Sequence, residues 1–151
     1  MNKAYHNGIR FITLLLATFT LIPGMAHLLE MPHKMQLTVE SYATVQYIYQ
    51  GWAWLGIIQV GAILFTGILL LYERRTGGSF SLILVAFICL LLTLVIFFIF
   101  TYPANIATNN WAVLPLNWTQ LRQQWEYSHA VNAVLEMIAY ILLLFAMLKV
   151  K

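Results

Sequence analysis

The sequence predicts an all-α integral membrane protein, a bundle of four transmembrane helices with both termini in the cytoplasm. Of the 151 residues, 62% are hydrophobic and only 9% are charged, whereas a soluble domain carries about a quarter charged residues. The apolar residues form four blocks, each near the ~20 residues that cross a ~30 Å hydrocarbon core. Lysine and arginine are also concentrated on one side of these blocks, which predicts the orientation.

The four blocks define four spans within a single domain, 1–151. They cover residues 11–30, 52–72, 80–102 and 128–149. Each is expected to be a helix, because lipid offers no partner to an unpaired backbone group. Pro32 is expected to follow the first span and Pro103 to close the third, and a polar turn at 73–78 joins the second to the third.

Basic residues predict which side each connection faces. Six lie on the side of the two termini and the 73–78 turn: Lys3, Arg10, Arg74, Arg75, Lys149 and Lys151. Only Lys34 and Arg122 lie on the other side. Cytoplasmic segments are enriched in lysine and arginine, so the first side is predicted to be cytoplasmic, in a bacterial inner membrane. A cleaved signal peptide ending at Gly24-Met25-Ala26 is the alternative for the N-terminus.

Two longer loops follow on the outer side, at 31–51 and 103–126. They contain most of the polar and aromatic residues, and we expect short interfacial helices at 37–49 and 118–127. The tyrosines and tryptophans between 42 and 54 are typical of an interface belt, with the roof of a ligand pocket as the alternative. The lipid bilayer is the partner that this pattern indicates. No basic patch interleaved with aromatics is present, which argues against nucleic acid.

Two short motifs bring histidine and glutamate together near the outer face. His27-Leu-Leu-Glu30 ends the first span and Glu126-Tyr-Ser-His129 begins the fourth. Residues three apart share a helix face, so we expect His27, Glu30, Glu126 and His129 at one depth. Glu-x-x-His on facing helices is the spacing of carboxylate-bridged metal sites in bundles, and these ligands suit iron, copper, zinc or manganese. Structurally, Glu126 is also an ordinary residue near a helix start.

The fourth span continues this polar stripe toward the membrane interior. Asn132 and Glu136 follow His129 on one face, and an ionisable residue inside a span indicates function. The structural alternative for Glu136 is a hydrogen bond to Asn132, Tyr140 or another helix. Asn105 is expected at the level of the histidines.

These residues resemble a family of small four-span bacterial membrane proteins, a group that includes the anthrone oxygenase-like family. The stretches that carry the resemblance are His27-Leu-Leu-Glu-Met-Pro-His-Lys34 with Tyr42 and Val45-Gln-Tyr-Ile-Tyr49, and Pro103-Ala-Asn105 with Arg122-Gln-Gln-Trp125-Glu126-Tyr-Ser-His129. The resemblance implies a four-helix membrane bundle and oxygen-dependent oxidation of a phenolic or quinone-like molecule. It implies site roles for Asn105, Trp125, Glu126 and His129, and for His27 and Glu30.

The leading hypothesis is therefore a membrane oxidoreductase of the oxygenase type acting on a lipophilic small molecule. His129 would act as general base or metal ligand, Glu126 would orient His129 or share the metal, and Asn105 would hydrogen-bond the substrate. Trp125, Asn132 and Glu136 would line the pocket. The alternatives are a non-enzymatic bundle that binds a metal, or haem between His27 and His129, and an accessory or transport subunit that forms homo-oligomers.

Overall fold

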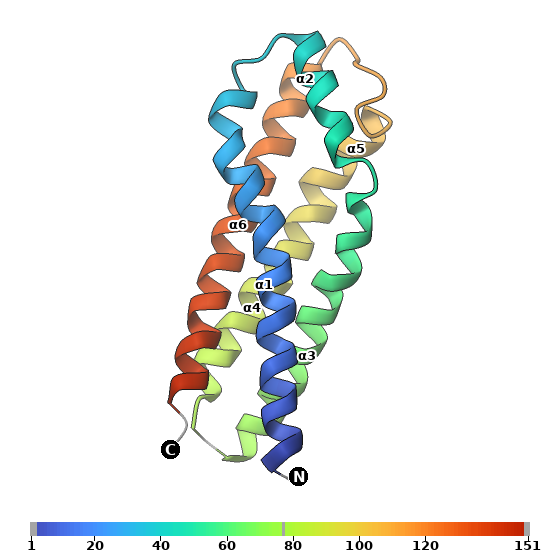
Figure 1. Cartoon of the computed structure of the whole chain (residues 1–151). Helices are drawn as coiled ribbons and strands as arrows, with labels where there is room; N and C mark the ends of the chain where they lie inside the picture. The colour runs from blue at the N-terminus through green and yellow to red at the C-terminus, as the bar shows by residue number, and fades with distance from the viewer. Residues whose placement is uncertain (1–2, 77, 150–151) are drawn as a thin grey trace.

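The computed structural model describes residues 3–76 and 78–149, and every regular element in these ranges is a helix (Figure 1). The long helices are α1 (Lys3–Lys34), α3 (Leu55–Thr76), α4 (Phe80–Ile96) and α6 (Trp118–Leu148). The shorter elements are α2 (Val39–Gln46), α5 (Tyr102–Ala107), the 3-10 turns η1 (Tyr47–Tyr49) and η2 (Trp52–Trp54), and the π-helical turn η3 (Phe97–Thr101). The predicted all-α class is confirmed.

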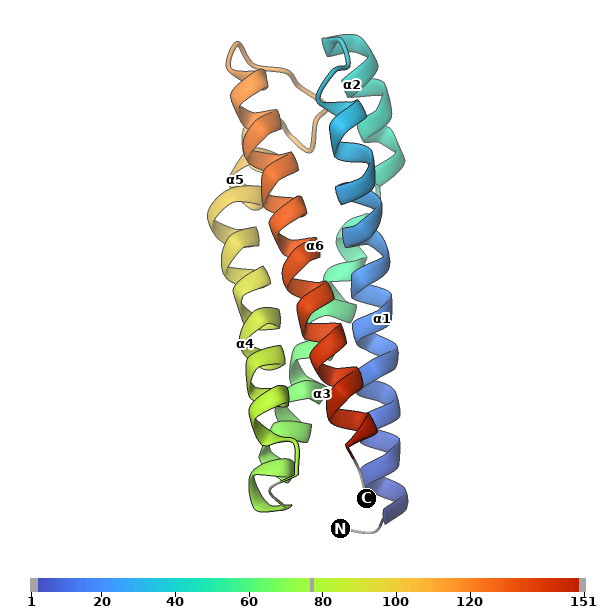
Figure 2. The same cartoon turned by 90° about the vertical axis from the view of Figure 1, so that its left-hand side faces the viewer.

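The long helices form an antiparallel bundle in which neighbours in sequence are neighbours in space (Figure 1). α1 packs against α3 and α6, and α4 packs against the same two helices. Figure 2 shows α6 lying between α1 and α4. The start of α1, the α3–α4 connection and the end of α6 lie at one end of the bundle, called here the proximal end. The opposite end, which carries α2 and α5, is the distal end.

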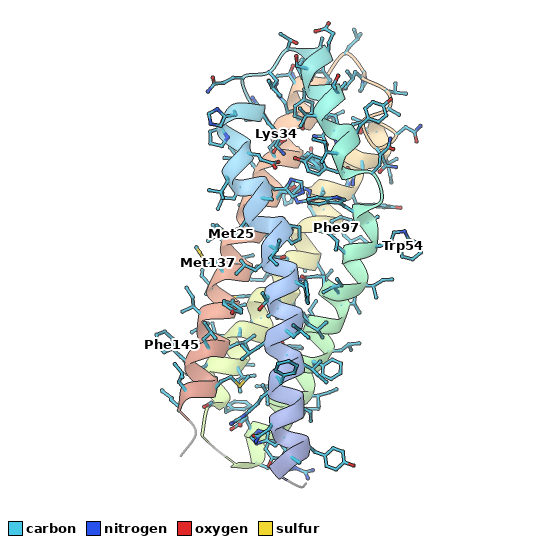
Figure 3. All side chains as sticks on the ribbon, in the orientation of Figure 1. Met25, Lys34, Trp54, Phe97, Met137 and Phe145 are labelled. Carbon is cyan, nitrogen blue, oxygen red and sulfur yellow. The ribbon has the colours of Figure 1, made fainter. Side chains whose placement is uncertain are left out.

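Four helical stretches are long and apolar enough to cross a membrane: Ala4–Lys34, Trp52–Arg75, Phe80–Ala107 and Trp118–Leu148. The prediction of four spans is confirmed, and by length and composition the chain is an integral membrane protein. Large apolar side chains such as Phe11 and Leu64 are exposed, and Figure 3 shows Met137 and Phe145 projecting from the outer surface. Lipid is the solvent that such a surface needs.

The first span extends past Pro32, which we expected to lie beyond its end. A proline near the end of a helix removes one backbone hydrogen bond and leaves the following turn possible. The Met35 N–H still donates to the Met31 carbonyl at 3.0 Å. The extra turn carries Lys34 over the end of the bundle.

The third span also continues past its proline, so the prediction that Pro103 closes it is wrong. The helix runs on through α5 to Ala107. Proline lacks an N–H, and its ring crowds the carbonyl four residues earlier. The wider π-helical turn at Phe97–Thr101 stands immediately before it and relieves this conflict. In this turn the Thr101 hydroxyl lies 2.7 Å from the Ser128 hydroxyl of α6.

Of the two short helices predicted between the spans, one is present as a separate element and the other is not. Residues 39–49 form α2 and η1, close to the predicted 37–49. The predicted 118–127 helix is instead the first part of α6, continuous with the fourth span. No glycine or proline interrupts residues 118–148, so nothing in the sequence ends the helix between them.

Small residues and one buried ion cluster hold the proximal half together. Ala17, Ala86 and Ala139 are buried between the helices, and such small side chains let membrane helices approach closely. At the proximal end Arg10 donates to the buried Glu73 carboxylate at 2.7 Å, and His6 Nε2 lies 3.2 Å from the same oxygen. These contacts join α1 to α3.

Candidate functional site

Ionisable and aromatic side chains from six elements meet at the distal end, forming what is called here the distal cluster. Its members are His27, Glu30, Lys34, Tyr42, Tyr49, Trp52, Asn105, Trp125, Glu126 and His129. On α1 and on α6 the contributing residues are three or four positions apart, so each helix presents them on one face. The helix extensions beyond the predicted spans are what bring the two faces together.

The Lys34 ammonium is the centre of the distal cluster, and its side chain is only 4% exposed (Figure 3). Its Nζ lies 3.1 Å from Glu126 Oε2 and 3.6 Å from Glu30 Oε2. It donates to the Tyr49 hydroxyl at 3.2 Å and faces His27 Nδ1 at 3.5 Å. Four acceptors thus surround three ammonium hydrogens, which satisfies a charge that would be very costly to bury alone.

The Glu126 carboxylate is the buried counter-charge on α6. Its Oε2 faces Lys34, and its Oε1 accepts a hydrogen bond of 3.0 Å from the Tyr42 hydroxyl. Both oxygens are therefore engaged by α1 and α2. We had expected Glu126 to orient His129, and its contacts are with Lys34 and Tyr42 instead.

The two histidines stack inside an aromatic box. The ring centroids of His27 and His129 are 4.3 Å apart. Trp125 packs against both, at 5.1 Å and 4.2 Å, while Tyr49 and Trp52 cover His27 at 4.6 Å and 5.6 Å. Within residues 3–76 and 78–149, no hydrogen bond engages a ring nitrogen of His129. Of the two imidazoles, that of His129 is thus the one with its nitrogens available for chemistry.

Asn105 fixes the tryptophan that supports the histidines. Its Oδ1 accepts a hydrogen bond of 2.8 Å from Trp125 Nε1. This is made possible by η3 and α5, which carry the helix past Pro103 to the level of the cluster. To hydrogen-bond a substrate, as predicted, Asn105 would have to use its amide nitrogen as the donor.

A second buried cation lies beside the cluster. Arg122 is 8% exposed. It donates to the Leu37 carbonyl at 3.0 Å, and its guanidinium lies 4.7 Å from the Trp118 ring and 5.4 Å from the Tyr42 ring. Contacts of this kind stabilise a desolvated guanidinium. Arg122 therefore contacts a carbonyl and aromatic rings, whereas Lys34 contacts the two cluster carboxylates.

The two tyrosine hydroxyls of the distal cluster are held as proton donors. Burial raises the pKa of Tyr42, and the neighbouring Glu126 carboxylate raises it further. Burial also raises the pKa of Tyr49, and so does its hydrogen bond to Glu30. Both effects disfavour the phenolate, so the two carboxylates keep these donors over a wide pH range.

The structure gathers most of the predicted site residues and separates two of them. Those brought together are His27, Glu30, Asn105, Trp125, Glu126 and His129. Asn132 donates instead to the Thr93 carbonyl on α4, at 3.2 Å. Glu136 lies against Gly24 on α1. These two residues belong to a different polar layer, deeper in the bundle.

Sequence reasoning missed Lys34, Tyr42 and Tyr49 as members of the site. The signal for Lys34 was present, since it stands four residues after Glu30 and seven after His27, on the same helical face. It was obscured because Pro32 was read as the end of the helix. The tyrosines come from α2 and η1, and no spacing rule predicts where such short elements fold back.

No protein-family model, curated protein or solved structure matches this chain. The chemistry of the distal cluster therefore rests on its own contacts.

The donor set of the distal cluster does not fit the predicted metal or haem. Among the described residues, no three histidine, cysteine, aspartate or glutamate side chains converge as metal ligands. The position between Glu30 and Glu126 is taken by the Lys34 ammonium, so the cluster already contains the cation that its carboxylates need. Stacked as they are, His27 and His129 also leave no room for a porphyrin between them. Metal binding stays a prediction.

The raised pKa values of the two tyrosines predict a loss of stability at high pH. The folded state keeps its phenol protons where the unfolded chain, with a pKa of about 10, releases them. The free energy of unfolding should therefore fall as pH rises above about 10, by up to about 1.4 kcal/mol per pH unit for each group. Unfolding measured in detergent micelles should show a shallower fall for Tyr42→Phe than for the wild type. Tyr47→Phe, at an exposed position, is the matched control, and equal slopes in all three proteins would contradict this account.

Proposed function

We propose that this chain is a membrane oxidoreductase that removes a proton from a lipophilic phenol or enol and lets the resulting anion react with dioxygen. One observation supports this above the others. A buried ammonium, Lys34, lies next to two stacked imidazoles among aromatic rings. A proton acceptor and a fixed positive charge are the two groups that stabilise a substrate anion.

His129 is the base in this proposal. Its ring nitrogens carry no hydrogen bond among the described residues, whereas Nδ1 of His27 already faces Lys34. A neutral imidazole nitrogen that carries no other hydrogen bond can accept a phenolic or enolic proton. His27 then supports the His129 ring by stacking.

Lys34 stabilises the oxyanion that deprotonation creates. Its contacts with His27 Nδ1, at 3.5 Å, and with Glu30 Oε2, at 3.6 Å, are the longest of the four. The oxyanion takes the ammonium hydrogen that points toward these two acceptors. The electron-rich carbon of the anion then reacts with dioxygen. A ring-activated CH₂ group gives up two hydrogens and gains one oxygen atom as a carbonyl, and the second oxygen atom leaves as water. No further reductant is required.

The substrate reaches the site from the lipid phase. Tyr49 and Trp52 cover His27 from η1 and η2. The neighbouring Trp54 is 75% exposed and projects outward from the bundle (Figure 3). If the η1–η2 segment moves aside, a flat aromatic molecule can take the place of the Tyr49 and Trp52 rings against His27. Stacking of this kind depends on ring geometry and accepts different aromatic partners. The resemblance to the anthrone oxygenase-like family supports the same substrate class.

The test is oxidation of anthrone by the full-length protein purified in detergent. Oxygen uptake and the appearance of anthraquinone should exceed the protein-free rate. His129→Ala should lower the rate by about 10²-fold or more, the usual contribution of a general base. His33→Ala is the matched control, since His33 is exposed near the same end of α1.

The outcomes separate the alternatives. A rate no higher than the protein-free rate, or equal rates for His129→Ala and the wild type, contradicts the proposal. Activity that a chelator abolishes and that iron or copper restores would favour the metal-dependent version predicted from the sequence.

We also propose that the proximal end faces the cytoplasm of a bacterial inner membrane, with the distal cluster near the outer face. Arg10, Arg74, Arg75 and Lys149 lie on proximal segments, and Lys3 and Lys151 flank them in the sequence. Lys34 and Arg122 lie at the distal end, and both are buried in ion-pair or ring contacts. The bias toward the proximal end supports this orientation.

A reporter fused after Lys151 tests the orientation. Green fluorescent protein should fluoresce there, and alkaline phosphatase, which is active only outside the cytoplasm, should be inactive. A fusion within the 110–116 loop should give the opposite pair of results. Phosphatase activity at the C-terminus would reverse the assigned topology.

A further inference from the structure

A second polar layer crosses the bundle one to two turns below the distal cluster, and all four spans contribute to it. This mid-bundle layer consists of Gly24 on α1, Gln59 on α3, Thr93 on α4, and Asn132 and Glu136 on α6. The Gln59 amide donates to the Thr93 hydroxyl at 2.6 Å, and the Asn132 amide donates to the Thr93 carbonyl at 3.2 Å. Thr93 thereby takes one N–H of each neighbouring amide.

Three oxygen atoms of the layer are left without a hydrogen-bond partner among the described residues. Gln59 Oε1, Asn132 Oδ1 and Glu136 Oε2 are buried, and none has a hydrogen-bond partner. The Thr93 hydroxyl cannot donate to any of these oxygens, because it already donates to the Leu90 carbonyl at 2.7 Å. Unpaired buried acceptors are costly, and lipid cannot supply the missing partner. Three such oxygens in one layer indicate a ligand that is positively charged or strongly hydrogen-bond donating.

Charge limits the ligand to a monovalent cation. No lysine, arginine or histidine contacts Glu136 among the described residues, and the ion pairs found there use other carboxylates. A single positive charge neutralises one carboxylate. A divalent ion would leave excess charge in a low-dielectric interior and prefers about six to eight oxygens.

Gly24 provides the room for this carboxylate. A Cβ at position 24 would collide with Glu136 Oε2 and lie 3.4 Å from the Ala133 Cα. The glycine therefore lets α6 and α1 approach while the carboxylate stays between them. This places the charged oxygen inside the bundle, away from lipid.

We infer that Gln59, Asn132 and Glu136 bind a monovalent cation, either sodium or a proton, inside the membrane-spanning part of the bundle. The amide oxygens and the carboxylate oxygen supply the ligands, and water completes the shell of a sodium ion. A bound proton resides on Glu136 and is shared with an amide oxygen. This site is independent of the chemistry proposed for the distal cluster.

The other groups near Glu136 do not supply this charge. On α6 the nearest titratable residues are His129, which stacks in the distal cluster, and Tyr140, one turn deeper. On α1 the nearest is His27, which faces Lys34. α3 and α4 face the layer with neutral Gln59 and Thr93.

Carbodiimide labelling of the full-length protein in detergent tests the inference. Dicyclohexylcarbodiimide adds to a protonated carboxyl group, and the adduct is located by mass spectrometry. For a sodium site, sodium chloride at ten times Kd should slow modification of Glu136 about tenfold, and choline chloride should not. For a proton site, the rate should fall as pH rises, and sodium should have no effect. Modification that responds to neither, or no modification of Glu136 while the exposed Glu30 is labelled, overturns the inference.

Three variants make the assignment specific. Glu136→Gln should lose the adduct. Gln59→Leu and Asn132→Leu, each purified with the wild-type elution volume, should shift the sodium or pH midpoint because each removes one ligand oxygen. Gln120→Leu, at an exposed position on α6, is the matched control and should leave the midpoint unchanged. Wild-type midpoints in both Leu variants would show that the amide oxygens are not ligands.

Discussion

The pairing of Lys34 with Glu126 is the constraint on which the distal half of this molecule depends. The two side chains come from the first and last spans, and both are almost fully buried. Neither charge is stable there without the other, because desolvation costs several kcal/mol per ion. Their attraction therefore fixes the last turn of α1 against the first turns of α6. Tyr42 and Tyr49 close over the pair, and the stacked histidines lie directly beneath it.

A second set of charged contacts fixes the opposite end of the bundle. At the proximal end, the Arg10–Glu73 ion pair joins α1 to α3, so α1 is anchored at both ends by charged contacts. Between these ends, buried threonines such as Thr20 and Thr66 bond to backbone carbonyls of their own helices, and the mid-bundle layer joins α3, α4 and α6. Besides this proximal ion cluster, the bundle has two polar centres: a distal one with buried charges and aromatic walls, and a deeper one with unpartnered oxygen acceptors. Acid–base chemistry suits the first, and cation binding suits the second.

Hydropathy was sufficient to predict the helical class and the number of spans, because the bilayer imposes a length on each apolar block. The same reasoning placed His27, Glu126 and His129 at one end of the bundle. It failed where two prolines were read as helix ends. Pro32 is tolerated in the last turns of α1, and Pro103 is accommodated by a π-helical turn. The first error hid Lys34, and with it the cation that lies between the two carboxylates.

Double-mutant coupling between positions 34 and 126 tests this account most directly. Lys34→Met, Glu126→Gln and the double variant would be compared by unfolding in mixed detergent micelles, with the exposed Glu40→Gln as control. Each single variant should lose about 3–5 kcal/mol, because it leaves one buried charge unpaired. The double variant should lose less than the sum of the two by at least about 1.5 kcal/mol. Strict additivity, or single variants as stable as the control, would show that the pair does not hold the two helices together.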